Sequence, residues 1–423
     1  MQDEKEKLLK TLAERIAEEQ QKKQGWEQTT LSGGLPGICL LLGKLMELYP
    51  GEERFVELAR GCLGQCVSYL NEHGTFSSSM FSGLAGMGLG AYCVSNGGRD
   101  YQKLIKTITG GVIEGVEKGI AEICQGSGTH CLFYDTMEGI SGMLSYLTLF
   151  AEDEKVRAIL EKGAQALIFL TREITVLGYQ VPGWHLPAEK QFSREESLLF
   201  PDGNFNTSLS HGIGGPLAVL ARLFEMGIRV PGHREALERI LAFYQEFCST
   251  DGEQEFWKGQ LDFHEVAEHR LTDQNIVRRD AWCYGSFGIC YAMLLAGKAL
   301  GRQEIITDAI RQMRQALTEI HGIFSPTLCH GYAGIYAVLQ GTEQELQKPL
   351  FGAEKEELLE KIWSYYDPAY SYGFYNYEFD RTSGELQREE DIGLLNGAAG
   401  VCLTLLEAAH PGKNPWKKAF LIG

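Results

Sequence analysis

A Gly-x-x-Gly element followed by an apolar run recurs along the whole chain. The seven copies begin at Gly34, Gly83, Gly139, Gly212, Gly285, Gly331 and Gly397, at intervals of roughly 45 to 75 residues. Glycine lets backbones approach closely at a crowded turn, and the run behind each copy is apolar almost all round. The pattern therefore predicts seven buried helices, each opened by a glycine turn.

Helices with a single apolar face are predicted between these buried ones. The clearest runs from Arg302 to Ile320, where apolar residues recur at spacings of three and four. Residues 154–174 and 234–247 repeat this pattern. Alternating all-apolar and one-faced helices indicate an inner and an outer layer, and repeats that span the chain close naturally into a ring. We expect an all-α fold, an α/α toroid of seven inner and seven outer helices, forming one domain over residues 1–423.

Three longer segments interrupt the helical pattern, at about residues 176–207, 250–277 and 367–390. We expect loops or short strands there. Long loops in a compact domain are usually functional or mobile. The third segment is rich in tyrosine, and the sequence leaves open whether it forms a peptide-binding rim or a solvated loop.

Composition and charge exclude several classes of protein. With 44% hydrophobic and 22% charged residues, the chain of 423 residues can bury a large core. Its net charge of −17 argues against a general nucleic-acid binder, which needs clustered Lys and Arg. The charged N-terminus, with apolar residues on one helical face, lacks the continuous apolar region of a signal peptide.

The longest apolar stretch also argues against a membrane protein. It runs from Ile392 to Ala409 and is interrupted by Asn396, Gly397 and Gly400, which favours a buried helix over a membrane span. We therefore expect a cytoplasmic protein without an integral membrane segment. In a reducing compartment the 11 cysteines are expected to be buried small hydrophobes or metal ligands, not disulfides.

Reactive side chains gather at equivalent positions of the repeats, just before the first glycine. The residues one before it are Gly33, Ser82, Glu138, His211, Tyr284, His330 and Asn396. Those two before it are Ser32, Phe81, Met137, Ser210, Cys283, Cys329 and Leu395. At the entrances of inner helices these side chains should converge on one end of the ring axis, where a pocket forms in such architectures.

Cys283 and Cys329 occupy the same position in neighbouring repeats, so we expect them to be close in space, and His330 follows the second. Two thiolates and an imidazole form a good zinc set, and three protein ligands leave the fourth tetrahedral position open, as in catalytic sites. The linear spacing alone is weak, because it contains no compact cysteine pair. We predict one Zn²⁺ per chain. Zinc with two thiolate ligands keeps an added thiolate reactive, which favours thiol alkylation over hydrolysis.

Three further residues are candidates for the chemistry. A lone histidine is usually structural, but His211 shares the register of the expected zinc ligands, which favours an acid-base role. Asp135 and Arg279 lie just upstream of their glycines. Each is either a surface charge or part of a pair that orients His211 and holds a carbonyl oxygen.

Four segments together resemble the lanthionine synthetase C-like (LanC-like) cyclases. They are Ala281 to Gly285, Leu328 to Gly334, Ser210 to Gly215, and Tyr134 with Asp135 through to Gly139. The resemblance covers nearly the whole chain and includes the seven-fold toroid of that family. It implies that Cys283, Cys329 and His330 bind zinc, that His211 is the principal acid-base residue, and that Asp135, Arg279 and Tyr284 are its companions in the active site.

The resemblance also implies a function. Cyclases of this family add peptide cysteine thiols to dehydroalanine or dehydrobutyrine and close (methyl)lanthionine thioether rings in lantibiotic biosynthesis. The expected partners are a dehydrated precursor peptide with its leader, and a dehydratase and a transporter in a biosynthetic complex that attaches the enzyme peripherally to the membrane. The initiator Met and the absence of a large preceding dehydratase region predict a stand-alone cyclase.

Other functions remain open at this point. Animal relatives in the family act on glutathione adducts, so a thiol-adduct enzyme is one alternative. A second is a zinc-dependent thiol-alkylating transferase such as a protein prenyltransferase subunit, although the usual zinc set there includes an Asp. A third is a cysteine hydrolase using Cys283 or Cys329, which needs no zinc. The last is a non-catalytic thiol-binding or peptide-binding scaffold, which only an assay excludes.

Overall fold

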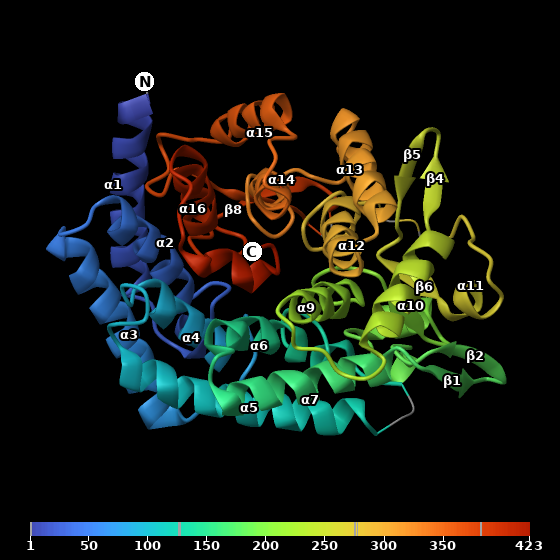
Figure 1. Cartoon of the computed structure of the whole chain (residues 1–423). Coiled ribbons are helices and arrows are strands. Elements are labelled where there is room, and N and C mark those ends of the chain that lie inside the picture. Colours follow the sequence, from blue (N-terminus) through green and yellow to red (C-terminus); the bar gives the residue numbers. More distant parts are fainter. Residues whose placement is uncertain (1, 126–127, 275, 277, 381–382) are drawn as a thin grey trace. The chain divides into compact units, whose positions relative to one another are not determined.

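The computed structural model describes residues 2–125, 128–274, 276, 278–380 and 383–423 (Figure 1). The chain divides into two compact units. The first comprises Met1–Val112 together with Ile323–Gly423, and the second is Ile113–Gly322. The boundary falls within helix α5 (Gln102–Ile123). A single domain over residues 1–423 stays a prediction, which this division does not test.

Each of the seven predicted buried helices is present in the described chain. They are α2 (Leu35–Leu48), α4 (Leu84–Cys93), α6 (Ile140–Leu147), α9 (Gly214–Glu225), α12 (Ser286–Leu300), α14 (Tyr332–Leu346) and α16 (Ala398–Ala409). Six begin directly after the first glycine of their repeat, and α9 begins two residues after Gly212. Most of their residues are buried. The glycine pattern therefore predicted the inner helices correctly.

The repeat before α12 shows why glycine is required at these turns. Gly285 has a φ of +98°, a conformation that side chains rarely adopt, and a Cβ there would overlap the carbonyl oxygen of Arg279. Gly288, one helical turn further, packs against the carbonyl oxygen of Trp282, which a Cβ would also overlap. The loop before the helix therefore folds back tightly onto its first turn.

The second set of helices is amphipathic. It consists of α1 (Gln2–Gln20), α3 (Glu53–His73), α5, α7 (Glu154–Leu170), α10 (His233–Glu246), α13 (Gln303–Thr318) and α15 (Gly352–Trp363). Helix α7 ends earlier than the predicted residue 174. The following Glu173–Val176 (β1) pairs with Tyr179–Pro182 (β2) around a two-residue turn, in which Leu177 and Gly178 both have positive φ.

Both units have the predicted layers. In the first unit α14 contacts α16, α16 contacts α2, and α2 contacts α4, while α15, α1 and α3 pack against these inner helices. In the second unit α6 contacts α9 and α9 contacts α12, backed by α7, α10 and α13 (Figure 1). Each unit therefore has an inner row of apolar helices and an outer row of amphipathic ones.

Backbone hydrogen bonds link the loops of consecutive repeats. In the second unit they run from Thr136 N–H to Ser210 O (3.0 Å) and from Ser210 N–H to Cys283 O (3.2 Å). In the first unit they run from Cys329 N–H to Leu395 O (3.0 Å), from Leu395 N–H to Ser32 O (2.9 Å), and from Ser32 N–H to Phe81 O (3.2 Å). Except for Thr136, these residues stand two positions before a first glycine. The predicted equivalence of this position is confirmed within each unit.

The three inserts contain short elements, as expected. In the second unit, Asn204–Asn206 (β3) pairs with Gln260–Asp262 (β6), and Ser249–Asp251 (β4) pairs with Gln254–Phe256 (β5). Short helices lie at Arg194–Leu199 (α8) and Phe263–Ala267 (α11). In the first unit, Asn376–Phe379 (β7) pairs with Leu386–Glu389 (β8). Single turns of 3₁₀ helix lie at Trp26–Thr29, Cys131–Phe133 (η2), Thr148–Phe150 and Ala188–Lys190, with a longer one at Pro415–Phe420.

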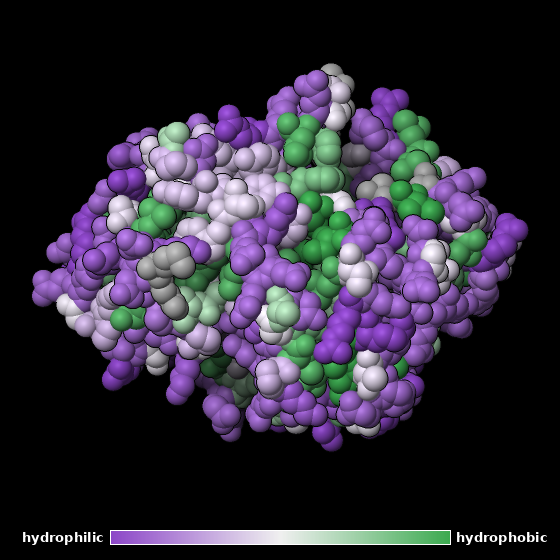
Figure 2. All heavy atoms as spheres, turned by 90° about the horizontal axis from the view of Figure 1, so that it is seen from above, coloured by the Kyte–Doolittle hydropathy of each residue, from purple (hydrophilic) through white to green (hydrophobic). Residues whose placement is uncertain are grey.

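The polarity of the surface and the burial of the cysteines can be compared with the expectations from composition. Figure 2 shows hydrophilic residues over much of the displayed face, with hydrophobic residues reaching the surface in places. Among the described helices, none is both long and apolar enough to cross a membrane. All 11 cysteines are free thiols. Eight of them are buried, in agreement with the prediction of buried small hydrophobes.

We expect Gly288→Ala to destabilise the protein, because its Cβ would overlap the Trp282 carbonyl inside a packed layer. Overpacking of this kind typically costs about 1–3 kcal/mol. The matched control is Gly110→Ala in α5, where a Cβ meets no atom within 4 Å. That change should be neutral or stabilise by up to about 1 kcal/mol. Denaturant unfolding of both variants measures the difference, and equal stabilities would contradict the packing argument.

Candidate active site

Asp135, which is buried, and His211, which is partly exposed, form a hydrogen-bonded pair in the second unit. Asp135 follows η2 and is fully buried, and its Oδ1 accepts hydrogen bonds from the backbone N–H groups of Glu138 and Gly139, each at 2.7 Å. Its Oδ2 lies 2.7 Å from Nδ1 of His211. The aspartate thus fixes the turn that opens α6 and also orients the imidazole of the next repeat.

Electrostatics keep the His211 imidazole basic. Burial alone lowers the pKa of His211, but the hydrogen bond and the negative charge of Asp135 outweigh that effect and raise this pKa above its ordinary value. The side chain is 25% exposed, so solvent or a ligand can reach it. A histidine held this way can exchange a proton near neutral pH.

Aromatic rings and one thiol surround His211. The ring of Phe192 lies edge-on at 5.1 Å and that of Tyr284 at 6.5 Å between centroids. The thiol of Cys131, the carboxylate of Asp135 and the imidazole of His211 have ligand atoms within 4.8 Å of one another, close enough to share a metal ion. Burial raises the pKa of the Cys131 thiol. A bound metal would deprotonate this thiol, so the geometry of the trio is compatible both with metal binding and with proton exchange by the Asp135–His211 pair.

Tyr284 is positioned by the inserts. Its hydroxyl oxygen accepts a hydrogen bond of 3.0 Å from Nδ2 of Asn206, a fully buried residue of β3. The backbone of Gly259, just before β6, packs against the tyrosine ring. Burial raises the pKa of Tyr284, so its hydroxyl stays neutral at physiological pH. The pairing of β3 with β6 therefore supports this side chain.

Cys283 lies beside the His211 loop. The thiol-bearing residue is buried, and its carbonyl oxygen accepts N–H groups from Leu209 (3.1 Å) and Ser210 (3.2 Å) and the hydroxyl of Ser210 (3.2 Å). These bonds place the Cys283 loop directly against the loop that ends in His211.

Arg279 opens the same segment as Cys283. Among the described residues it forms no hydrogen bond with His211 or Asp135, so its role stays a prediction. The adjacent Asp280 is fully buried and accepts hydrogen bonds from the Ser286 hydroxyl (2.8 Å) and the His321 N–H (2.9 Å). This aspartate holds the turn that leads into α12.

Cys329 and His330 belong to the first unit, whereas Cys283 belongs to the second, and each is described within its own unit. Nε2 of His330 is in direct contact with a carboxylate oxygen of Glu378 in β7. The strand itself is tied to the loop before His330, because the hydroxyl of Ser325 donates to Oδ1 of Asn376 (2.8 Å) and accepts the N–H of Tyr377 (3.3 Å). The third insert therefore supplies a carboxylate to the predicted zinc ligand.

The sequence reasoning missed Asn206, Glu378 and Cys131. Asn206 and Glu378 lie inside the predicted inserts, where no repeat register exists to give them a partner. The alternation of polar and aromatic residues around Glu378 was a usable signal for a strand with two different faces. Cys131 lies four residues before Asp135, outside the repeat positions that were compared.

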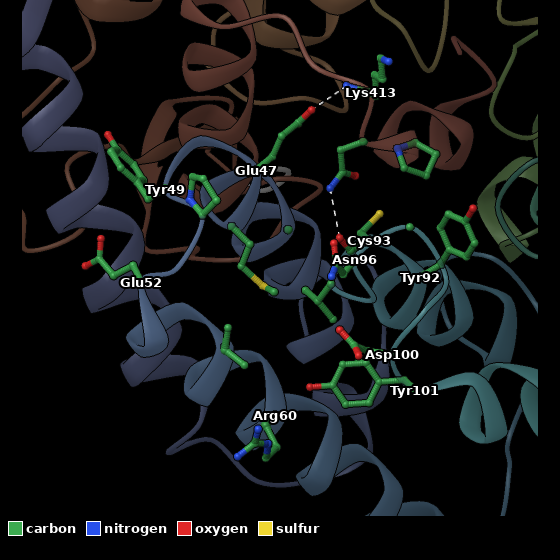
Figure 3. A pocket seen from close by; sticks show the side chains of 18 of the residues that line it. Glu47, Tyr49, Glu52, Arg60, Tyr92, Cys93, Asn96, Asp100, Tyr101 and Lys413 are labelled. Atoms are coloured by element: carbon green, nitrogen blue, oxygen red, sulfur yellow. Dashed lines mark hydrogen bonds between the residues drawn. The ribbon is translucent and has the colours of Figure 1, made fainter.

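A cavity of about 770 Å³ lies elsewhere in the first unit (Figure 3). It is lined by residues at the ends of α2 and α4, among them Glu47 and Cys93. Glu47 accepts the backbone N–H of Lys413 (2.9 Å), and the Asn414 amide donates to the carbonyl of Cys93 (3.3 Å). The predicted site residues precede the starts of inner helices and do not line this cavity, which opens at the opposite ends of α2 and α4.

Comparison with known proteins identifies the family. Residues 25–421 match the family model described as lanthionine synthetase C-like protein. The nisin biosynthesis protein NisC of Lactococcus lactis subsp. lactis is 27% identical over 399 residues, which cover 93% of this chain and 89% of that protein. The solved structure of a nisin cyclase matches with a TM-score of 0.84 and 26% identity, covering 98% of both chains.

These matches confirm the α/α toroid as the fold class and a lanthionine cyclase as the class of enzyme. The family match covers far more than half of the sequence and includes all four segments that carry the resemblance. The chain belongs to the lanthionine synthetase C-like family.

Proposed function

We propose that this protein is a zinc-dependent cyclase that closes (methyl)lanthionine rings in a dehydrated precursor peptide. The observation that carries the proposal is the hydrogen-bonded pair of loops in the second unit. One loop presents His211 with its carboxylate partner, and the other presents Cys283. An acid-base imidazole beside a thiol that can bind a metal suits the addition of a peptide thiol to an activated alkene.

The zinc ligands in this proposal are Cys283, Cys329 and His330. Two observations support the set. The two cysteines stand in the same position of consecutive repeats, a position that is hydrogen-bonded from loop to loop within each unit. His330 pairs with Glu378, and a carboxylate on one ring nitrogen is the usual support for a histidine that binds zinc through the other. Zinc, when bound, lowers the pKa of a substrate thiol while leaving its sulfur nucleophilic.

The acid-base work falls to His211. The thiolate sulfur attacks the β-carbon of the dehydrated residue, and the alkene electron pair moves to the carbonyl oxygen and forms an enolate. The proton lost by the thiol is returned at the α-carbon, so the mass of the peptide does not change. Asp135 raises the pKa of His211, so the neutral imidazole can take the thiol proton and the protonated imidazole can donate a proton to the α-carbon.

Tyr284 and Arg279 complete the proposed site. A neutral Tyr284 hydroxyl, held by Asn206, can donate a hydrogen bond to the substrate. Arg279, just ahead of the Cys283 loop, is proposed to stabilise the developing oxyanion. The similarity to the nisin proteins supports a precursor peptide with a leader as substrate. A dehydratase and a transporter as partners, a cytoplasmic location and peripheral attachment to the membrane belong to the same proposal.

We expect one zinc ion per chain, lost in Cys283→Ala and in Cys329→Ala. Glu378→Gln should retain the fold and weaken zinc affinity about 10-fold to 100-fold, because His330 loses the carboxylate that orients it. Glu385→Gln, an exposed residue ahead of β8 in the same hairpin, is the matched control and should not change the affinity. Metal analysis and competition with a chelator provide the measurements. Full zinc in either cysteine variant would refute the ligand set.

We expect His211→Asn to keep its zinc and slow ring closure by about 10²–10⁴, the usual contribution of general acid-base catalysis. The assay measures loss of alkylatable thiols in a dehydrated precursor peptide at constant mass. Activated thiols also add to dehydroalanine unaided, so slow and incorrectly paired closure should persist. If the parent consumes neither thiols nor dehydrated residues, the cyclase function is wrong, and an unchanged rate in His211→Asn would make that residue structural.

We expect Asp135→Asn to lower the pKa of His211, because the variant removes the negative charge while Asn can still accept the hydrogen bonds from the turn. A raised histidine pKa stabilises the fold below the unfolded-state pKa, and this contribution disappears as pH rises through the folded-state value. The stability lost in the variant should therefore be larger at mildly acidic pH than at alkaline pH. NMR titration of the imidazole tests the shift, and an unchanged His211 pKa would show that Asp135 does not control it.

A further inference from the structure

An aromatic groove lies beside the third insert of the first unit. Its volume is about 400 Å³, and Phe324, Tyr365, Tyr366, Asp367, Tyr377 and Leu386 are among the residues that line it. Pockets for small ligands typically measure about 300–1,000 Å³. We call this feature the aromatic groove.

Strand β7 connects the groove to the predicted zinc ligand. Side chains alternate along a strand, so Glu378 points to one face and its two neighbours point to the other. Glu378 pairs with His330. Tyr377 packs against Tyr365 with ring centroids 5.2 Å apart, and Phe379 packs edge-on against Phe324 at 4.8 Å. Strand β7 therefore carries the carboxylate that contacts His330 on one face and the Tyr377 and Phe379 rings on the other.

A second contact reaches the same turn from the other direction. Tyr332 opens α14 two residues after His330, and its ring lies 6.0 Å from that of Tyr365. The groove therefore adjoins the Cys329–His330 turn through Tyr332, the first residue of α14.

The groove offers apolar surface to a ligand. Phe324 and Leu386, which line the groove, are 39% and 44% exposed, and Phe379, whose ring packs against Phe324, is 48% exposed. The carboxylate of Asp367 is paired with Arg388 at 3.6 Å, so it adds little net charge. Exposed apolar groups rimmed by polar ones mark interaction sites, and tyrosines supply rigid contact area at low entropic cost.

We propose that the aromatic groove binds apolar side chains of the precursor peptide that flank the residues being joined, and so selects which cysteine enters the site. This inference rests on the proposed function, because it takes His330 as part of the site that receives the thiol. A peptide ligand fits this surface, because the groove residue Tyr365 packs against Tyr332, two residues after the proposed zinc ligand His330. The groove then favours ring closure next to apolar residues.

The test uses synthetic peptides in which dehydroalanine, two alanines and cysteine are flanked on both sides by Phe-Leu or by Gly-Ser. The full-length parent should close the Phe-Leu peptide with a kcat/KM about 10-fold to 100-fold higher, the gain expected from burying one large apolar side chain. In Phe324→Ser with Phe379→Ser, that preference should fall to about twofold, mainly through a higher KM, with zinc content unchanged. The control Phe76→Ser replaces an aromatic ring that is 61% exposed elsewhere in the unit and should keep the preference.

A binding measurement separates this inference from the proposed function. Labelled analogues with Ala for dehydroalanine and Ser for cysteine cannot react, and their affinities follow from fluorescence anisotropy. The parent should bind the Phe-Leu analogue more tightly, and the double variant should bind both analogues equally. If this holds but no ring closes in the reactive peptides, the function is wrong and the groove stands. A preference for the Phe-Leu analogue that survives in the double variant overturns the inference. The inference is also wrong if sedimentation shows a dimer of the parent that is lost in the double variant, because the groove residues would then join two copies of the chain.

Discussion

The candidate site depends on the backbone hydrogen bonds that link the loops before consecutive inner helices. The backbone N–H of one loop can reach the carbonyl oxygen of the next only if both loops lie at the same level along the inner helices. The tight glycine turns fix where each loop lies relative to its helix. A buried backbone donor without a partner is costly, so a register shift in one loop would also disturb the next. This is why residues far apart in sequence, such as Ser210 and Cys283, are neighbours in the fold.

The same constraint explains how much of the site the sequence could predict. Glycine spacing identified the inner helices, and the position before each glycine identified His211, Cys283 and the Cys329–His330 turn. These features repeat, so seven weak signals combine into one strong one. The direct contact between Asp135 and His211 also follows from adjacent repeats, although only the structure provides its distance and the resulting rise in the pKa of His211.

The residues that the sequence did not reveal depend on pairing between non-repeated segments. Asn206 reaches Tyr284 because β3 pairs with β6, whose residues lie more than 50 positions further along the chain. Glu378 reaches His330 because β7 is tied to Ser325. The alternation around Glu378 indicates a strand, but strands of three or four residues give no signal of the segment that each one contacts. The early end of α7 has the same origin, because residues 173 and 174 of the predicted helix belong to a local hairpin instead.

The repeat loops and the inserts contribute differently to the candidate site. Among the described residues, the loops before Gly34, Gly83, Gly139 and Gly331 have no strand-containing insert ahead of them. The Gly139 loop provides Asp135, and the Gly331 loop provides Cys329 and His330. The first insert leads directly into the His211 loop, the second leads towards Cys283 and Tyr284, and the third packs against the Cys329–His330 turn. Repeats provide position, because backbone bonds fix where each loop lies. Inserts provide support, because they bring the amide that holds Tyr284 and the carboxylate that contacts His330.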